Sequence, residues 1–298
     1  MKKLFVFAAF FLCSAFSSFS FTGNDVTQKI GEFSTIINST VANAATEQNV
    51  YSSAWIGKLF PSAPPHLAVG VEAGVTKLDM EPLKDMAQIF GVTGLPSLLV
   101  FPTLTANARV GGFFLPFDIG FSAMYLDLTK LDSIADGLGF NFFDIGGDIR
   151  WAILKGTGPL PQISVGAGYY YISGSLSYAK EGLAASIDYA THTAFAQAQI
   201  SKTFIFFTPY VGFRGIVYSS KADWNWAVSP SQIAGAPLYV DTAFAGTGSA
   251  SADWFGNFLP QVYGGFGLNL AFFALNFGAA YEFKNGIWGG DLSVRFQM

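Results

Sequence analysis

Charged residues are scarce in this 298-residue chain: they make up 12% of it, whereas ordinary soluble domains carry roughly 25%. Hydrophobic residues make up 51%, and the mean hydropathy is +0.39. Even so, we find no run of about 18 residues after the N-terminus that lacks both charge and proline, as a spanning helix requires. The best candidate, 110–126, is interrupted by Pro116 and Asp118. A membrane protein without spanning helices must be a closed barrel, because hydrocarbon offers no partner to open backbone groups.

Cysteine is nearly absent, since Cys13 is the only one. It lies in an N-terminal stretch with two early lysines, an apolar segment over 4–12 and small residues over 14–20, which predicts a secretory signal peptide at 1–20. Cleavage after Ser17 or Ser20 fits this pattern, and the bulky Leu12 argues against lipidation of Cys13. The mature chain would then contain no cysteine, which excludes a disulfide framework and thiolate chemistry.

Basic residues are outnumbered by acidic ones. Removal of the two leader lysines changes the 16 basic residues to 14 against 20 acidic ones, a net charge of −6. A chain of this charge is not expected to bind nucleic acid.

Histidine is also scarce, with only His66 and His192. Asp188 and His192 would share one strand face, but positions four apart in a strand lie roughly 13 Å apart, too far for a catalytic hydrogen bond. His66 follows two prolines and is interpreted as a linker residue. A lipid-hydrolase site completed by a serine on a neighbouring strand stays open as an alternative, but with so few catalytic residues we expect no enzyme activity. Acidic and histidine residues do not cluster at metal-ligand spacing, so we expect no metal and no cofactor.

What the sequence does contain is strand-like alternation, and the clearest example is 140–173. In its first arm, apolar residues at odd positions from Phe143 to Ile153 alternate with small or charged ones such as Asp144, Asp148 and Arg150. After the turn at 155–161, the alternation resumes from Ile163. This stretch predicts one complete transmembrane hairpin, because each arm has one apolar face and is long enough to span the membrane.

The same pattern recurs along the chain. We predict an all-β fold, a transmembrane antiparallel up-and-down β-barrel of ten strands preceded by a helical segment. The predicted strands are 66–79, 97–112, 117–128, the two arms of 140–173, 185–201, 210–220, 260–272, 275–283 and 288–298. A hairpin within 237–253 would raise the count to twelve. An even number of strands is typical of single-chain bacterial barrels. The predicted domains are the signal peptide at 1–20, the helical segment at 21–65 and the barrel at 66–298.

The segment ahead of the barrel has a different period. From Asn24 to Tyr51, apolar residues fall at steps of three and four, which predicts a weakly amphipathic helix. A shorter helix is expected over 80–91. Two interpretations of the first helix remain open: it plugs the lumen or closes the periplasmic mouth, or it forms a mobile periplasmic arm or interfacial helix.

The two ends of the strands differ. One set of turns is short and rich in phenylalanine, as at 113–114, 204–207 and 272–273, while the other set is long with tyrosine and tryptophan nearby. Short periplasmic turns, long external loops and two aromatic girdles are the expected layout. We therefore place the irregular segment 221–257 outside the cell. Its aromatic residues are the candidate ligand-binding residues of the outer loop: Trp224, Trp226, Tyr239 and Trp254.

The inward face is predicted to carry charge. By parity, the candidate lumen or selectivity residues are Glu72, Arg109, Asp118, Asp144, Asp148, Arg150, Arg214, Glu282, Asp291 and Arg295. One interpretation is an ion-paired, packed interior that stabilises a narrow barrel. The other is a pore or a plugged lumen, since many inward positions are glycine and leave space.

The signal, the ten alternating segments and the last strand together resemble a bacterial outer-membrane β-barrel protein. The resemblance covers about 67–298. In such proteins the last strand ends in alternating apolar residues with a terminal aromatic, which the barrel-insertion machinery reads. Leu292, Val294 and Phe296 match that pattern, whereas Met298 stands where phenylalanine is usual. The helical segment and the Phe-Phe-Leu-Pro-Phe turn also resemble uncharacterised spirochaete outer-membrane proteins, which are loosely compared with long-chain fatty-acid transporters.

These features predict a monomer in the bacterial outer membrane, with membrane lipid, the insertion machinery and a small or hydrophobic solute as partners. The function hypothesis is a passive channel or transporter for that solute. The alternative is a closed structural barrel that displays adhesive or ligand-binding loops.

Overall fold

The computed structural model describes residues 23–57, 65–89, 96–112, 115–127, 137–180, 183–228 and 244–298. The predicted signal peptide and Tyr239 lie outside these residues. The elements, in chain order, are α2 (Gly23–Glu47), β1 (His66–Asp79), α3 (Glu81–Ile89), β2 (Leu98–Gly111), β3 (Phe117–Asp127), β4 (Leu138–Lys155), β5 (Gln162–Lys180), β6 (Leu183–Ser201), β7 (Phe207–Val228), β8 (Phe244–Ala252), β9 (Phe258–Leu270), β10 (Phe273–Glu282) and β11 (Ile287–Gln297).

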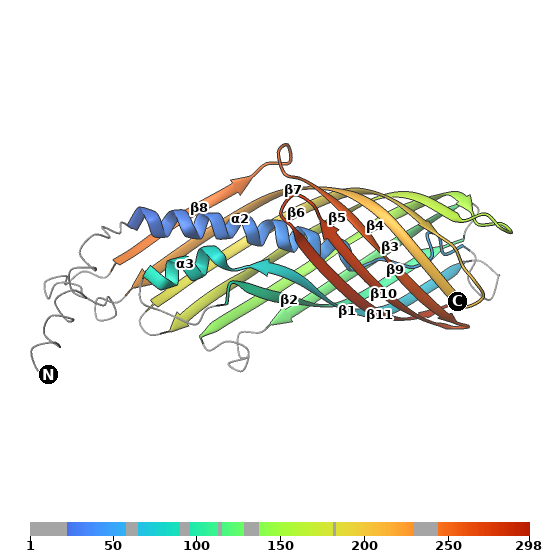
Figure 1. Ribbon diagram of the computed structural model, residues 1–298, viewed down its shortest axis with the longest axis horizontal. Helices are drawn as coiled ribbons and strands as arrows, with labels where there is room; N and C mark the ends of the chain where they lie inside the picture. The colour runs from blue at the N-terminus through green and yellow to red at the C-terminus, as the bar shows by residue number, and fades with distance from the viewer. Residues whose placement is uncertain are drawn as a thin grey trace, which may run out of the picture.

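The strands form one closed antiparallel barrel (Figure 1). Neighbours in sequence pair from β1 to β7, and β11 pairs with β1. On its other side β7 pairs with β9 over its first half and with β8 over its second half. Since β8 and β9 share one position beside β7, the eleven strands occupy ten positions in the wall. The predicted fold class, with ten strands and an N-terminal helix, is confirmed.

Strand lengths differ from the prediction on one side of the barrel. The segment 221–257 was expected to be irregular, but β7 continues to Val228, and β8 covers 244–252. Likewise β5 continues to Lys180, where an outer loop was expected. Alternation persists through these stretches, but their outward residues are polar, as with Lys221 and Asp223. A polar outward face is typical of strand that extends beyond the membrane, and this is why it resembled a loop.

The outer face shows where the membrane ends. Along β5 the outward residues from Ile163 to Tyr171 are apolar or aromatic, and the next three are Ser173, Ser175 and Ser177. Strand β7 changes in the same way between Val217 and Ser219. Strands β9, β10 and β11 end near this level, because Phe258 at the start of β9 pairs with Val217. The wall is therefore tall on the β4–β8 side and short on the β9–β11 side.

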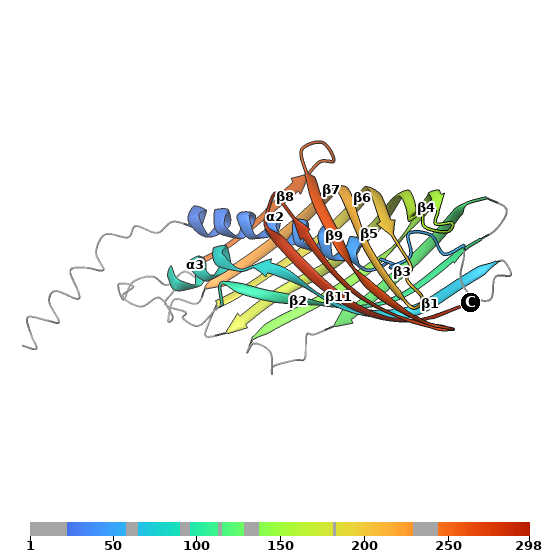
Figure 2. The ribbon, with the colours of Figure 1, turned by 45° about the vertical axis from the view of Figure 1, so that its right-hand side comes forward.

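We call the end of the barrel at turns 156–161, 202–206 and 271–272 the turn end, and the opposite end the loop end. Helix α2 begins beside α3 at the loop end and runs down inside the barrel (Figures 1 and 2). The chain that follows α2 reaches the turn end at Ile56, whose N–H donates to Asp118 at 3.0 Å. Among the described residues, no helix is both long and apolar enough to cross a membrane.

The first helix was predicted to end at Tyr51, but α2 ends at Glu47. The wall accounts for the difference, because Arg109 donates to the carbonyl of Asn49 at 3.3 Å and Gln199 donates to that of Tyr51 at 2.7 Å. These bonds use backbone carbonyls that would accept helical hydrogen bonds if the helix continued. Of the two interpretations left open by the sequence, the structure places the helix in the lumen.

Candidate functional site

The lumen is occupied by one continuous piece of chain, residues 23–57, which we call the lumen segment. From Ile37 to Ile56 most of its side chains are buried. It consists of α2 followed by a non-helical strap, 48–57, which lies across the barrel interior toward the turn end. The candidate site is the contact between this segment and the inward face of the wall.

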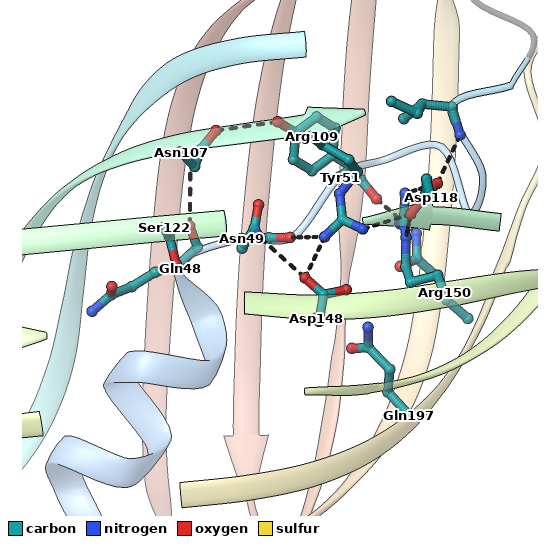
Figure 3. A network of polar contacts seen from close by, with 12 residues as sticks. Gln48, Asn49, Tyr51, Asn107, Arg109, Asp118, Ser122, Asp148, Arg150 and Gln197 are labelled. Atoms are coloured by element: carbon teal, nitrogen blue, oxygen red, sulfur yellow. Dashed lines mark hydrogen bonds and ion pairs between the residues drawn. The ribbon is translucent and has the colours of Figure 1, made fainter. Parts of the chain in front are cut away.

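At the turn end, four charged wall residues form one ion-pair network (Figure 3). Asp118 receives Arg109 at 2.6 Å and Arg150 at 2.8 Å, and Asp148 receives a second nitrogen of Arg109 at 2.5 Å. All four side chains are at most 2% exposed. Ion pairs removed from water to this degree hold together only when their geometry and further hydrogen bonds offset the loss of hydration.

The strap supplies those further hydrogen bonds (Figure 3). The side chain of Asn49 donates to Asp148 at 3.0 Å, and the carbonyl of Ser53 accepts from Arg150 at 3.0 Å. Ile56 completes the coordination of Asp118, as described above. The network therefore joins strands β2, β3 and β4 to the strap as a single polar unit.

Inward glycines let long side chains reach across a strand. Gly120 of β3 lies between Arg109 of β2 and Asp148 of β4 in one row across the sheet. A Cβ on Gly120 would lie 2.4 Å from a guanidinium nitrogen of Arg109, so the arginine passes over the glycine to reach Asp148. Three further rows repeat the arrangement: Asn107–Gly70–Arg295, Ser122–Gly146–Tyr170 and Gln199–Gly212–Tyr263, each with a hydrogen bond between its outer members. At these positions the space that glycine leaves is filled by a neighbouring side chain.

Tyr51 of the strap lies among three arginines. The guanidinium groups of Arg295, Arg109 and Arg150 lie 3.9, 5.0 and 5.8 Å from the centre of its ring. Its hydroxyl donates to Asn107 at 3.3 Å. An aromatic face attracts cations, and the attraction is strongest where water is excluded. Tyr51 thus holds the strap against three arginines of the wall, each of which also pairs with a buried acid.

Higher in the barrel, α2 is fastened by neutral and acidic side chains. Asn38 accepts from Thr191 at 3.0 Å, Asn43 and Glu47 each accept from Gln261 at 3.1 Å, and Thr76 lies 3.3 Å from the second oxygen of Glu47. These contacts involve three different strands, so the helix is held from several sides of the wall.

At the loop end the helix is held by exposed charges. Lys29 bonds Glu32 at 3.1 Å and lies 3.7 Å from Asp85 of α3. The hydrogen bond with Glu32 raises the pKa of Lys29, and the same bond lowers the pKa of Glu32. Exposed pairs of this kind stabilise little, so at this end of the segment the polar contacts with the wall are the weakest.

All ten candidate lumen residues face inward, but they do not form one site. Arg109, Asp118, Asp148 and Arg150 form the network above, and Glu72 pairs with Arg295 at 2.5 Å. Arg214 lies between the rings of Phe195 and Tyr263 and donates to Gln197 and Gln261. The remaining members have separate places, as follows.

Glu282 accepts the backbone N–H groups of Lys284 and Asn285, so it caps the β10–β11 turn. Asp291 borders Gly278, and one of its oxygens has no hydrogen bond within the described residues. Asp144 is fully buried beside the amide of Gln48 in the strap, and neither of its oxygens forms a hydrogen bond of normal geometry in the described chain. Their predicted role in selectivity stays a prediction.

Two of the outer-loop candidates are placed differently from the prediction. Trp224 and Trp226 lie in β7, not in a loop, and their side chains are buried at 6% and 3% exposure. They point inward, where Trp224 contacts Gly31 of α2 and the two indoles lie over Gly248 and Gly246 of β8. The sequence signal that could have placed them inward is parity. Both are even-numbered, like Tyr218, which the alternation of β7 already placed inward. Trp254 lies between β8 and β9 and is partly exposed.

The tall side of the wall has an apolar inner face. In its upper part, Phe142, Leu176, Ile187 and Tyr189 join the two tryptophans in one hydrophobic cluster with the apolar face of α2. The residues that α2 contributes are Ile30, Phe33, Ile37 and Val41. We call this cluster the apolar funnel. The sequence alone did not reveal it, because α2 and the β4–β7 inner faces are far apart in the chain.

The histidines lie apart from the charged network. His192 is on the outer face, where its ring nitrogen lies 2.5 Å from the hydroxyl of Tyr169, and its neighbour Asp188 is exposed. His66 is the first residue of β1 and is buried. Within the described part of the chain, no group of three or more histidine, cysteine, aspartate or glutamate side chains is arranged to hold a metal ion.

No family model and no curated protein matches this chain. Solved structures that it resembles include the translocator domain of the autotransporter NalP from Neisseria meningitidis, at 7% identity and a TM-score of 0.41, covering 89% of this chain and 96% of that one. A major outer membrane protein from Thermus thermophilus matches at 8% identity and a TM-score of 0.36, covering 78% and 99%. Likeness this distant does not bear on function.

The geometry itself is that of a bacterial outer-membrane β-barrel, as predicted. The barrel is closed and has an even number of strand positions. Its outer surface has an apolar belt that lies between two girdles of aromatic residues. Exposed aromatics at the turn end include Phe204, Phe206, Phe272 and Phe273; those toward the loop end include Tyr125, Tyr169, Tyr281 and Trp288. Such a surface is stable only in lipid, which places the chain in the outer membrane. The finer resemblances to spirochaete proteins and to fatty-acid transporters stay predictions.

Proposed function

We propose that this barrel is a passive channel for small or hydrophobic solutes and that the lumen segment keeps it closed. One observation carries the proposal: the wall closes through strand pairing alone, and the segment that fills it belongs to none of those pairs. Displacing the segment would leave the wall intact and open a space that now accommodates a whole helix. An α-helix with side chains is about 10 Å wide, enough for a small organic solute.

The apolar funnel favours a hydrophobic solute. It lies toward the loop end, which we place outside the cell because the long connections are there. A solute would displace the loop-end part of α2 from Trp224 and its neighbours, where the exposed Lys29 contacts hold least. It would then meet the charged network at the turn end, which forms the final barrier. The last strand, β11, stays the predicted signal for the insertion machinery.

Planar-bilayer conductance tests this proposal with a reversible tether. Asn38→Cys and Thr191→Cys would link α2 to β6, since the present side-chain oxygens lie 3.0 Å apart. We expect the oxidised double variant to be silent and the reduced one to conduct. Uptake of a hydrophobic solute into proteoliposomes should respond to the tether in the same way.

Each single-cysteine variant is the matched control, because it should not respond to oxidation. A second variant lacking 23–57 should conduct permanently. If the tether changes neither current nor uptake, and the deletion variant folds but is also silent in both assays, the channel proposal is wrong.

The alternative function, a closed structural barrel that displays binding loops, is favoured by one observation. The ion pairs between Arg109, Asp118 and Arg150 are fully buried, as expected of a permanent interior. Silence of both variants, together with binding of a ligand that is lost when 229–243 is deleted, would support it.

A further inference from the structure

A cavity of about 250 Å³ opens beside α2 on the short side of the wall. The helix contributes Thr35, Ile36, Ser39 and Thr40; the wall contributes Lys77, Asp79, Tyr218 and Ile287, with Asn257, Lys284 and Asn285 from the adjoining turns. It lies where β9, β10 and β11 end and where α2 takes the place of a taller wall. None of the contacts between the lumen segment and the wall described above lies in this cavity.

Two lysines converge on this cavity from different elements. Lys77 comes from the end of β1 and lies 3.4 Å from the carbonyl of Gly286; Lys284 comes from the β10–β11 turn and lies 3.3 Å from that of Gly256. Both ammonium groups are thus held by neutral oxygens. The one acid in the lining, Asp79, accepts the N–H of Glu81 at 3.0 Å and so begins α3. The lining therefore holds two lysines and one acid, and the buried carboxylate of Glu282 lies beneath the same turn, where it accepts the N–H groups of Lys284 and Asn285.

One hydroxyl beside the cavity lacks a partner and is covered by its neighbours. Thr40 is fully buried, and its hydroxyl has no hydrogen-bond partner within the described residues. A buried polar group of this kind costs free energy unless something bonds it. The neighbouring Ser39 instead donates to the carbonyl of Ile36 at 2.9 Å, so Thr40 is the side chain that lacks a partner.

The cavity also lies at the level where the strands leave the membrane at the loop end. Lys77 is the next outward position on β1 after Val75, and Lys284 follows Tyr281 by three positions, near the exposed Trp288. Aromatic rings of this kind lie at the headgroup level of a bilayer. A ligand at this cavity can therefore come from the headgroup layer or from water.

We propose that this cavity binds a phosphate group, which Lys77 and Lys284 neutralise and to which Thr40 donates once its hydroxyl is uncovered by a small shift of the side chains around it. The phosphate belongs either to an anionic lipid headgroup or to a free phosphate compound. Bound there, it joins α2 to β1 and to the β10–β11 turn. The proposal goes beyond solute passage and does not depend on it.

Titration of full-length protein in a neutral detergent tests the site, with three probes: inorganic phosphate, short-chain phosphatidylglycerol and short-chain phosphatidylcholine. Calorimetry gives affinity, and native mass spectrometry gives the number bound. We expect phosphatidylglycerol, phosphate or both to bind one to one, and the zwitterionic lipid to bind at least about tenfold more weakly. Lipid binding alone identifies the headgroup as the source; binding of inorganic phosphate identifies the phosphate group itself.

Three variants locate the site. Lys77→Ala and Lys284→Ala should each weaken binding by about tenfold or more, while Lys221→Ala, at an exposed lysine on β7, should not. Thr40→Val should weaken it by about three- to tenfold and leave stability unchanged, because the hydroxyl has no partner without the ligand. Absence of binding by both anionic probes, or equal affinity in all variants, would overturn the proposal. Conductance is not needed for either result.

Discussion

Arg295, in the last strand, places its guanidinium group 3.9 Å from the centre of the Tyr51 ring, in the strap that crosses the lumen. The same arginine pairs with Glu72 of the first strand. The contact between Tyr51 and Arg295 thus joins the strap to the seam where β11 meets β1. Closure of the wall and retention of the lumen segment therefore share one residue.

Replacing Tyr51 should loosen the strap without unfolding the wall. Tyr51→Ala removes a desolvated cation–π contact of about 2 kcal/mol, so we expect the lumen segment to become more mobile and the conductance events more frequent. Tyr51→Phe keeps the ring and loses only the bond to Asn107, so it should stay close to wild type. Single-channel recordings of the two variants measure the difference. Equal event rates in both variants would argue against the aromatic contact.

Gly120 offers a test of how the charged network is assembled. A methyl group there would lie 2.4 Å from both Arg109 and the side-chain nitrogen of Asn49, so Gly120→Ala must displace both of them. We expect a loss of about 1–3 kcal/mol in the free energy of unfolding, measured by denaturant titration in detergent. Gly290→Ala is the control, because its nearest atom would be at 3.5 Å, an ordinary contact. A loss of equal size in both variants would show a general effect of strand glycines instead.

The fold could be predicted because alternation has a period of two and parity assigns the face of every strand residue. For this reason Asp118 and Arg150 were correctly placed inward, and strand pairing then sets them directly opposite each other. Parity alone does not give the contact between Arg109 and Asp148. That contact spans three strands and requires both the register and the gap at Gly120.

The lumen contacts were beyond the sequence for a different reason. Helical periodicity showed that 24–51 has an apolar face, but it does not identify what covers that face. The covering residues, such as Trp224, are nearly 200 positions away and were read as part of a loop because their outward neighbours are polar. Beyond the membrane only the inner face of a strand is apolar, so the hydrophobic pattern there resembles that of a loop.

The turn at the β6–β7 connection is expected to be strained. Ile205 has φ of 56°, a left-handed conformation that β-branched residues rarely adopt, and its side chain is 95% exposed. Ile205→Gly should therefore stabilise the barrel by about 1 kcal/mol, seen as a higher denaturation midpoint. Ile205→Val keeps the branching and should give no gain. If valine stabilises as much as glycine, loss of exposed apolar surface, and not backbone strain, is the cause.

Two aspartates on neighbouring strands should respond in opposite ways to the same change. Asp118 of β3 accepts hydrogen bonds from two arginines and from the N–H of Ile56, so Asp118→Asn leaves buried cations without their shared carboxylate. Removing one partner of a buried pair costs about 3–5 kcal/mol. Asp144 of β4 is equally buried, but its polar neighbour is the neutral amide of Gln48, and neither of its oxygens forms a hydrogen bond of normal geometry in the described chain, so Asp144→Asn should be neutral or stabilising.

Denaturant titration of the two variants in the same detergent measures this contrast, with the electrophoretic shift of the folded barrel as a second readout. Asp188→Asn, at an exposed acid on β6, controls for loss of one negative charge. If Asp144→Asn destabilises as strongly as Asp118→Asn, then Asp144 has a partner in the folded protein that must be sought in the lumen. If neither variant differs from Asp188→Asn, the network does not hold the strap, and the tether and the deletion of 23–57 become the tests of whether the lumen segment closes the barrel.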